Sequence, residues 1–211
     1  MAGTTEYYIP AGAGEAEYDE KRSRFLGHIR PVYTEEEARG FIAETKKTHY
    51  DARHNCWCYI IKDGPERYSD DSEPQGTAGI PMLEVLRRQG VQNAVCVVTR
   101  YFGGVLLGAG GLLRAYTRAA SDALDAAGVC AVRRWTELRV PCSYAALDKI
   151  KTELASFDGL VSDISYAAAV TITALVPEEQ AESFAARVTD VTAGGSVCAA
   201  TGTKERAVRI K

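Results

Sequence analysis

Apolar residues change from strand-like to helix-like spacing within one stretch of the chain, residues 95–127. The stretch opens with β-branched residues at 95–99, a composition typical of a buried strand. From Leu112 to Ala127 the apolar residues recur at helical spacing, and arginines and aspartates occupy the opposite face. Five glycines separate the two patterns: Gly103, Gly104, Gly108, Gly110 and Gly111. The pattern predicts a strand, a glycine-rich loop and a helix, in that order.

The glycine-rich loop allows two interpretations. The first amides of a helix lack internal partners and carry partial positive charge from the helix dipole, so a loop that enters a helix is suited to an anion. Arg114 and Arg118, one turn apart, would then either clamp a phosphate or solvate the outer face. The same glycines also permit a tight crossover in which loop and helix pack closely. The spacing matches neither the dinucleotide fingerprint nor the P-loop, so both interpretations remain open.

The rest of the N-terminal half predicts a mixed α/β layout with its helices on one side of a sheet. Residues 1–16 are rich in Gly, Ala and Thr, and we expect them to be loosely held. Thr34 is a natural N-cap for the first helix, because acidic residues follow it and lysines end the segment. The expected strands and helices are strands 25–33, 54–61 and 95–99, helices 34–48 and 79–89, and the long helix that ends at Ala127.

The C-terminal part repeats a β-α-β-β-α-β pattern, which is the ferredoxin-like order. The expected strands are 136–141, 160–166, 168–176 and 196–202, and the expected helices are 143–157 and 177–190. Arg133–Arg134 is the expected linker. We therefore predict an α+β protein with two domains, residues 1–132 and 136–211.

Composition narrows the functional classes. Hydrophobic residues make up 46% of the chain and charged residues 25%, as in ordinary globular proteins. The net charge is −3, so nucleic acid would have to bind through a local basic patch. The sequence shows no apolar run of membrane-spanning length and no secretion signal. None of the six cysteines forms a CxxC pair, which favours reduced thiols. These features predict a cytoplasmic protein without a membrane partner.

An acidic loop, SDDSEPQGTAG, precedes the helix expected at 79–89. Its three carboxylates, Asp70, Asp71 and Glu73, are oxygen ligands of the kind that Mg²⁺ prefers. The loop is also typical of a solvated acidic turn, and one carboxylate is suited to cap the helix that starts near Ala78. The residues favour the solvated loop or the cap over the metal site, because no base or nucleophile accompanies them.

Three stretches resemble the YigZ/IMPACT family. RYFGGVLLGAGGLLRAY at Arg100–Tyr116 is similar to the family signature RYFGGxxLGxGGLxRAY. The pair HN at His54–Asn55 and the segment DDSEPQGTAGIPML at Asp70–Leu83 are similar to two further family motifs. Because all three occur in the family's order, the chain is identified as a member of the bacterial YigZ-like branch.

The resemblance implies both a fold and a field of function. It implies an N-terminal domain similar to the second domain of a small-subunit ribosomal protein and to domain IV of elongation factor G, and a C-terminal domain similar to that factor's fifth domain. Eukaryotic relatives modulate the starvation response by binding the large ribosome-associated activator of a translation-factor kinase. This sequence shows no counterpart of their additional N-terminal partner-binding domain. We therefore expect a translation-associated regulator that binds RNA, the ribosome or a translation-related protein.

The resemblance also brings His54 and Asn55 into one signature with the glycine loop, although a histidine at the start of a strand is often only a packed residue. No catalytic residue or cofactor is assigned, and whether the chain is an enzyme stays open. The alternatives are a small-ligand protein or enzyme that acts on a phosphorylated metabolite or nucleotide, and a protein–protein adaptor. The expected anion- or RNA-binding residues are Arg24, His54, Asn55, Arg100, Gly103, Gly104, Gly108, Gly110, Gly111, Arg114 and Arg118.

Overall fold

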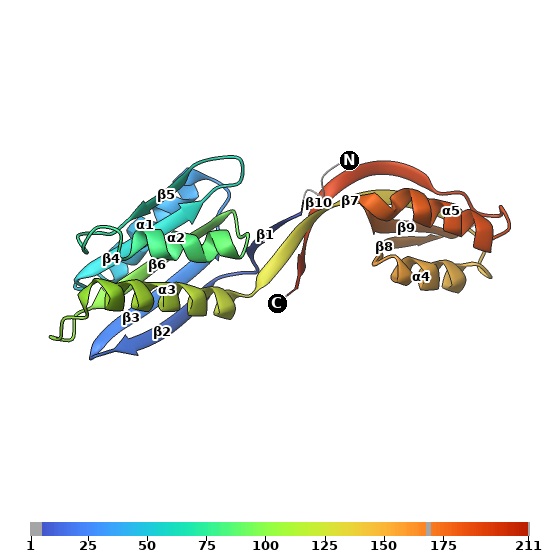
Figure 1. Ribbon diagram of the computed structural model, residues 1–211. Helices are drawn as coiled ribbons and strands as arrows, with labels where there is room; N and C mark the ends of the chain where they lie inside the picture. Colours follow the sequence, from blue (N-terminus) through green and yellow to red (C-terminus); the bar gives the residue numbers. More distant parts are fainter. Residues whose placement is uncertain (1–5, 168–169, 211) are drawn as a thin grey trace. The chain divides into compact units, whose positions relative to one another are not determined.

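A computed structural model describes residues 6–167 and 170–210, which form two compact units (Figure 1). Among the described residues, one unit comprises Tyr7–Ala131 together with residues 207–210, and the other comprises Val132–Arg206 together with Glu6. Separate sets of buried apolar residues fill the two units. The predicted α+β class is confirmed. No helix in the described part of the chain is long and apolar enough to span a membrane.

The N-terminal unit is built on a five-stranded sheet in the order β2-β3-β6-β4-β5. Neighbouring strands are antiparallel throughout. The central strand, β6, is buried along nearly its whole length and carries the signature residue Arg100 near its end. The strands are β2 (Gly14–Glu20), β3 (Ser23–Pro31), β4 (His54–Ile60), β5 (Glu66–Ser69) and β6 (Ala94–Tyr101).

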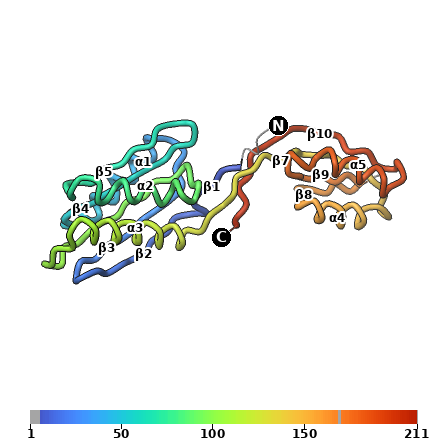
Figure 2. The backbone as a smooth tube through the Cα atoms, viewed as in Figure 1, coloured from blue at the N-terminus to red at the C-terminus, as the bar shows by residue number. Residues whose placement is uncertain are grey.

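Helices cover both faces of this sheet, so the expectation of helices on one side is wrong. Val95 and Val97 of β6 pack in the cluster that contains α1, whereas Cys96 and Val98 pack with α2 and α3. The sequence hides this because β6 is uniformly apolar and shows no alternation of inward and outward positions. Helices α2 and α3 run side by side (Figure 1, Figure 2). The helices are α1 (Glu35–Thr48), α2 (Gly79–Arg88) and α3 (Gly108–Ala127).

The sequence predicts the start of one helix correctly and places the start of another too late. The Thr34 side chain accepts a hydrogen bond from the Glu37 amide at 3.1 Å, so the expected N-cap of α1 is confirmed. Helix α3 begins at Gly108, earlier than the apolar periodicity that starts at Leu112. The difference has a simple cause: glycine has no side chain and adds nothing to a hydrophobic pattern. The last three glycines of the loop therefore belong to the first turn of α3.

The expectation that residues 1–16 are loosely held is wrong for the part that the structure describes. Strand β1 (Tyr7–Pro10) and strand β2 are both regular, while residues 1–5 lie outside the described residues. A Cβ on Gly14 would overlap the backbone of α3 at Ala123, and a Cβ on Gly27 would overlap it at Ala119. These glycines serve the close packing of a helix on the β2–β3 hairpin, not flexibility.

The C-terminal unit confirms the predicted β-α-β-β-α-β order. Strand β7 pairs with β9 and β10, and β9 pairs with β8, while α4 and α5 pack over a shared apolar cluster. The start of the expected strand 168–176 falls on residues 168–169, which lie outside the described residues. The elements are β7 (Val129–Cys142), α4 (Leu147–Ser156), β8 (Leu160–Tyr166), β9 (Val170–Pro177), the 3₁₀ turn Glu178–Gln180, α5 (Ala181–Val191) and β10 (Ala199–Arg209).

The expected linker at Arg133–Arg134 is wrong, because both arginines lie inside the continuous strand β7. Arg133 pairs with Glu6 at 2.6 Å, and Arg134 pairs with Glu178 at 3.2 Å. Two adjacent charges in the sequence suggested an exposed junction, but each has an ion-pair partner. The division between the compact units passes through β7, and the domain bounds 1–132 and 136–211 stay a prediction.

Candidate anion-binding site

The acidic loop is organised by Asp70, which caps the start of α2. Its carboxylate accepts hydrogen bonds from the amides of Gly76 at 2.8 Å, Ala78 at 3.1 Å and Gly79 at 2.8 Å. These amides would otherwise lack partners, and a carboxylate is favoured at the positive end of the helix dipole. Of the three interpretations of the loop, helix capping is the one that describes Asp70.

Asp71 connects the loop to its neighbours. Its carboxylate accepts hydrogen bonds from Lys46 Nζ and from the backbone N–H of Asn55, both at 2.7 Å. Its backbone, at a φ of +43°, turns the chain so that the carbonyl oxygen accepts from His54 Nδ1 at 2.8 Å. The described residues contain no cluster of three or more His, Cys, Asp or Glu side chains that could hold a metal ion.

Glu73, the third carboxylate of the loop, forms a buried ion pair with Arg100. Arg100 Nη1 donates to Glu73 Oε1 at 2.7 Å, and the Tyr116 hydroxyl donates to the same oxygen at 2.8 Å. The two charged side chains are only 6% and 3% exposed. Burial, and then the negative charges of neighbouring groups, raise the pKa of Tyr116. Tyr116 therefore stays a hydrogen-bond donor to the carboxylate.

The Arg100 guanidinium keeps unused hydrogen-bonding capacity. Nη2 lies 3.5 Å from Ser23 Oγ, and the rings of Phe25 and Phe102 lie within 5.5 and 5.4 Å of the guanidinium carbon. Nε is buried and forms no hydrogen bond with the described residues. A guanidinium carries five donors, and a buried unpartnered donor costs about 1–3 kcal/mol. The ion pair with Glu73 thus holds the Arg100 guanidinium in place but leaves its Nε donor without a partner among the described residues.

His54 is held in one orientation beside this pair. A carbonyl oxygen can only accept, so the contact with Asp71 places a proton on Nδ1. The other ring nitrogen, Nε2, lies 3.8 Å from Glu73 Oε1. Only 11% of the His54 side chain is exposed. The His54 ring is therefore held between the acidic loop and the Glu73–Arg100 pair.

These side chains line a cavity of about 350 Å³, which we call the tip cavity. Apolar side chains from the 102–112 segment line it together with the polar groups described above. Helix α3 begins at this cavity without a side-chain cap, since its N-cap residue is Leu107. The first helical amides are thus available to an anion. The lining residues are Arg53, His54, Glu73, Pro74, Arg100, Phe102, Leu106, Leu107, Gly108, Ala109 and Leu112.

The glycines of the loop have different physical roles. A Cβ on Gly103 would overlap the Arg22 backbone, so this position requires a close approach. Gly104 and Gly108 have φ values of +84° and +72°, where other residues are strained. A Cβ on Gly110 would meet only Arg114 Nη1, at 3.7 Å. Tight packing and backbone conformation both contribute, so neither sequence interpretation excludes the other.

The structure gathers only part of the expected site at the cavity. His54, Arg100 and Gly108 line it, and so does Arg53, which is not among the expected site residues. The buried role of Glu73 was missed, because a carboxylate in an acidic loop carries no sign of a partner 27 positions later.

Other expected residues lie apart from the cavity. Arg114 and Arg118 do not line it, and Arg118 pairs with Asp122 at 2.7 Å on the exposed face of α3. Arg24 pairs with Glu17 at 2.8 Å. Asn55 is buried, with Oδ1 accepting from Thr99 at 2.7 Å and Nδ2 donating to a backbone carbonyl. Asn55 thus braces β4 against β6. Whether any of these residues binds a ligand stays a prediction.

Comparison with known proteins identifies the family of this chain. Residues 21–124 match the Impact N-terminal domain, and residues 140–194 match a domain of unknown function, DUF1949. The chain is 41% identical to IMPACT family member YvyE of Bacillus subtilis over 90% of this chain and 88% of that protein. The chain belongs to the IMPACT family. The resemblance seen in the sequence motifs is therefore confirmed.

Two further matches show how far the family relationship extends. IMPACT family member YigZ of Escherichia coli is 34% identical over 89% of this chain and 94% of that protein. Protein IMPACT of Rattus norvegicus is 33% identical, but the match covers 47% of this chain and 33% of the rat protein. A crystal structure titled as that of a hypothetical protein aligns over 93% of this chain with a TM-score of 0.58 at 33% identity.

Proposed function

We propose that this IMPACT family protein is a translation-associated binding protein whose N-terminal unit holds a phosphate group of RNA at the tip cavity. The observation that carries the proposal is Arg100. Glu73 holds the buried Arg100 guanidinium at the cavity wall, and the Nε of Arg100 has no hydrogen-bond partner among the described residues. The uncapped start of α3 lies at the same cavity, so two independent features favour an anion there.

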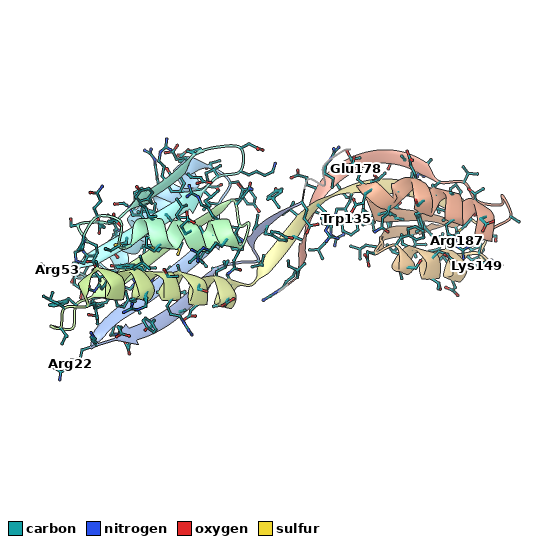
Figure 3. The ribbon with its side chains drawn as sticks, in the orientation of Figure 1. Arg22, Arg53, Trp135, Lys149, Glu178 and Arg187 are labelled. Atoms are coloured by element: carbon teal, nitrogen blue, oxygen red, sulfur yellow. The ribbon has the colours of Figure 1, made fainter. Side chains whose placement is uncertain are left out.

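Unpaired cations in the cavity lining and in the turn between β2 and β3 would supply the local positive charge that the acidic chain as a whole lacks. Lys21, Arg22 and Arg53 are exposed and form no ion pair with described residues. Arg22 and Arg53 project from the same end of the N-terminal unit (Figure 3). Glu73 neutralises much of the charge of Arg100, so these outer cations and the helix dipole would supply the long-range attraction.

The link to translation rests on resemblance between folds, which supports a function by analogy. Both units have folds expected from the family resemblance to translation factors and a ribosomal protein. The open sheet of the C-terminal unit offers few stacking aromatics, because Tyr166 with its neighbour Tyr144 is the main exposed aromatic pair in the described part of that unit. The N-terminal cavity is therefore the better candidate for the RNA contact.

Ribosome co-sedimentation and binding of a labelled short RNA, each at two salt concentrations, test this proposal. Arg53→Ala removes one cavity-lining cation and should weaken RNA binding by about tenfold or more, since a charge-assisted contact is worth about 1.5–3 kcal/mol. Arg87→Ala is the matched control, because it removes an exposed arginine that already pairs with Glu66 and Glu84. Equal binding by wild type and Arg53→Ala at low salt would contradict the proposal.

A second candidate function is recognition of a small phosphorylated metabolite or nucleotide. The size and apolar wall of the tip cavity favour it, because ligand pockets of about 300–1,000 Å³ commonly combine apolar walls with a few polar groups. Isothermal titration with mononucleotides and sugar phosphates distinguishes the two functions. Saturable binding of one small phosphate ligand, with no gain from a longer RNA, would favour the metabolite.

A further inference from the structure

We infer that the turn at Lys21–Arg22 is a second phosphate-binding subsite beside the tip cavity, so that the ligand is a single-stranded RNA segment with at least two successive phosphates. This inference rests on the proposed function, because it extends the cavity site along the ligand. It does not follow from the cavity alone, which would accept a single phosphate.

The residue types in this turn are unusual for its backbone conformation. Strand β2 ends at Glu20 and β3 begins at Ser23, with these two residues paired, so Lys21 and Arg22 are the entire loop. Both have positive φ, +46° and +68°. A two-residue hairpin loop with two positive φ values strongly prefers Asn-Gly or a similar pair. Two long cationic side chains in left-handed conformations are therefore a local departure from the favoured turn chemistry.

Packing of these side chains does not explain the departure. Lys21 and Arg22 are exposed, and neither forms an ion pair or hydrogen bond with the described residues through its side chain. Strained non-glycine residues at positive φ persist when the surrounding structure holds them, and they concentrate at functional sites. A pair of adjacent exposed cations in such a turn has the chemistry to contact a phosphate.

The turn and the cavity form one continuous piece of structure. Ser23 Oγ accepts a hydrogen bond from the Gly103 amide at 3.2 Å and lies 3.5 Å from Arg100 Nη2. The Arg22 backbone packs so closely on Gly103 that a Cβ there would overlap it. The cations of the turn are thus fixed beside the loop that enters α3, and the side chain of Arg22 projects from the end that also carries Arg53 (Figure 3).

Single-stranded RNA fits this arrangement better than a duplex or an acidic peptide. Phe102, which lines the cavity, is 44% exposed and offers a face on which an unstacked base can lie. Bases inside a duplex are stacked and cannot enter a cavity. An acidic peptide would satisfy the cations but would leave the exposed aromatic face of Phe102 without a matched partner.

The test compares wild type with the double variant Lys21→Asn, Arg22→Gly, using two probes: uridine 5′-monophosphate and a labelled hexauridylate. Asn-Gly suits the turn, so the variant should unfold at higher urea concentration than wild type. It should bind the hexauridylate about tenfold more weakly, with a salt slope shallower by about 0.7 for each lost phosphate contact. Its affinity for the monophosphate should be unchanged.

Lys47→Ala, Arg88→Ala is the control for net charge, because it removes two exposed cations from α1 and the end of α2. This control should bind both probes as wild type does.

Two results would overturn the inference. One is equal binding of hexauridylate by wild type and the turn variant, and the other is equal affinity of wild type for the two probes. In both cases the proposed function survives if the monophosphate still binds and Arg53→Ala weakens it. Failure of wild type to bind either probe would overturn both, and displacement of hexauridylate by a hexaglutamate peptide at equal concentration would overturn the choice of RNA.

Discussion

The ion pair between Glu73 and Arg100 makes a strong prediction for stability, because both charges are buried. Glu73→Gln keeps the shape of the side chain but removes its charge, which leaves the guanidinium without a counterion at 6% exposure. Breaking a buried pair by removal of one partner costs about 3–5 kcal/mol. The glutamine oxygen can still accept from Arg100 or Tyr116, so we expect a loss of about 3 kcal/mol, at the lower end of that range.

A comparison variant separates the charge from the hydrogen bonds. Tyr116→Phe removes the hydroxyl that donates to Glu73 Oε1 at 2.8 Å and leaves the ion pair intact. A hydrogen bond to a charged group is worth about 1.5–3 kcal/mol, so this variant should lose less than Glu73→Gln. Glu84→Gln, on the surface of α2, is the control, and it should lose no more than about 1 kcal/mol because exposed ion pairs contribute little.

Urea unfolding followed by tryptophan fluorescence measures these losses. The chain has two tryptophans, and Trp57 lies in β4 of the N-terminal unit while Trp135 lies in β7. A Trp135→Phe background therefore reports on the unit that contains the ion pair. If Glu73→Gln lowered the free energy of unfolding by less than about 1 kcal/mol, the pair would not act as a buried charge pair, and the argument that it fixes Arg100 at the cavity would fail.

Three further predictions follow from packing and burial. Gly27→Ala should lower the free energy of unfolding by about 1–3 kcal/mol because its Cβ meets α3, whereas Gly110→Ala should be neutral or stabilise by up to about 1 kcal/mol, as thermal melts would show. Thiol titration should count six free cysteines after denaturation and no more than two, Cys130 and Cys198, in the native protein. Burial raises the pKa of Cys198 to about 11, so this thiol should react slowly at pH 8, and fast reaction would contradict its burial. Burial lowers the pKa of His28 despite Glu15 nearby, so the folded state binds the proton less readily than the unfolded state, whose histidine titrates near pH 6.5. The contribution of His28 is therefore complete above about pH 6.5 and is lost as the pH falls through its lower folded pKa, and His28→Gln should flatten that part of a urea-midpoint profile.

Elements with a local signal were predictable from the sequence. Thr34 and its acidic neighbours mark the start of α1 without reference to any other part of the chain, and Leu160–Tyr166 was expected at the bounds that the structure shows. The short strand β5 (Glu66–Ser69) was missed, because its polar residues show no apolar alternation and it forms only by pairing with β4.

The candidate site was only partly predictable, for a different physical reason. The signature motifs name His54 and Arg100, but the cavity depends on contacts between residues far apart in the chain. Glu73 and Arg100 meet because the acidic loop folds back over the end of β6, and no periodicity records that contact. Arg114 and Arg118 have the helical spacing of a phosphate clamp, yet neither lines the cavity, and Arg118 pairs with Asp122 instead. Spacing within one element thus predicts which residues share a face, but not what that face meets.

The hairpin between β2 and β3 was not predictable from the sequence, because its two-residue loop lacks the residues that usually mark such a turn. An Asn-Gly loop would have indicated the turn, but Lys21–Arg22 has no residue that is typical of one. The segment before it contains glycines, from which we expected a loosely held N-terminus. Local sequence rules fail most often where a site places other demands on the residues. On this argument the missing turn signal and the two strained cations have one cause. The variant Lys21→Asn, Arg22→Gly separates them, because restoring favourable turn chemistry should strengthen the fold and weaken RNA binding together.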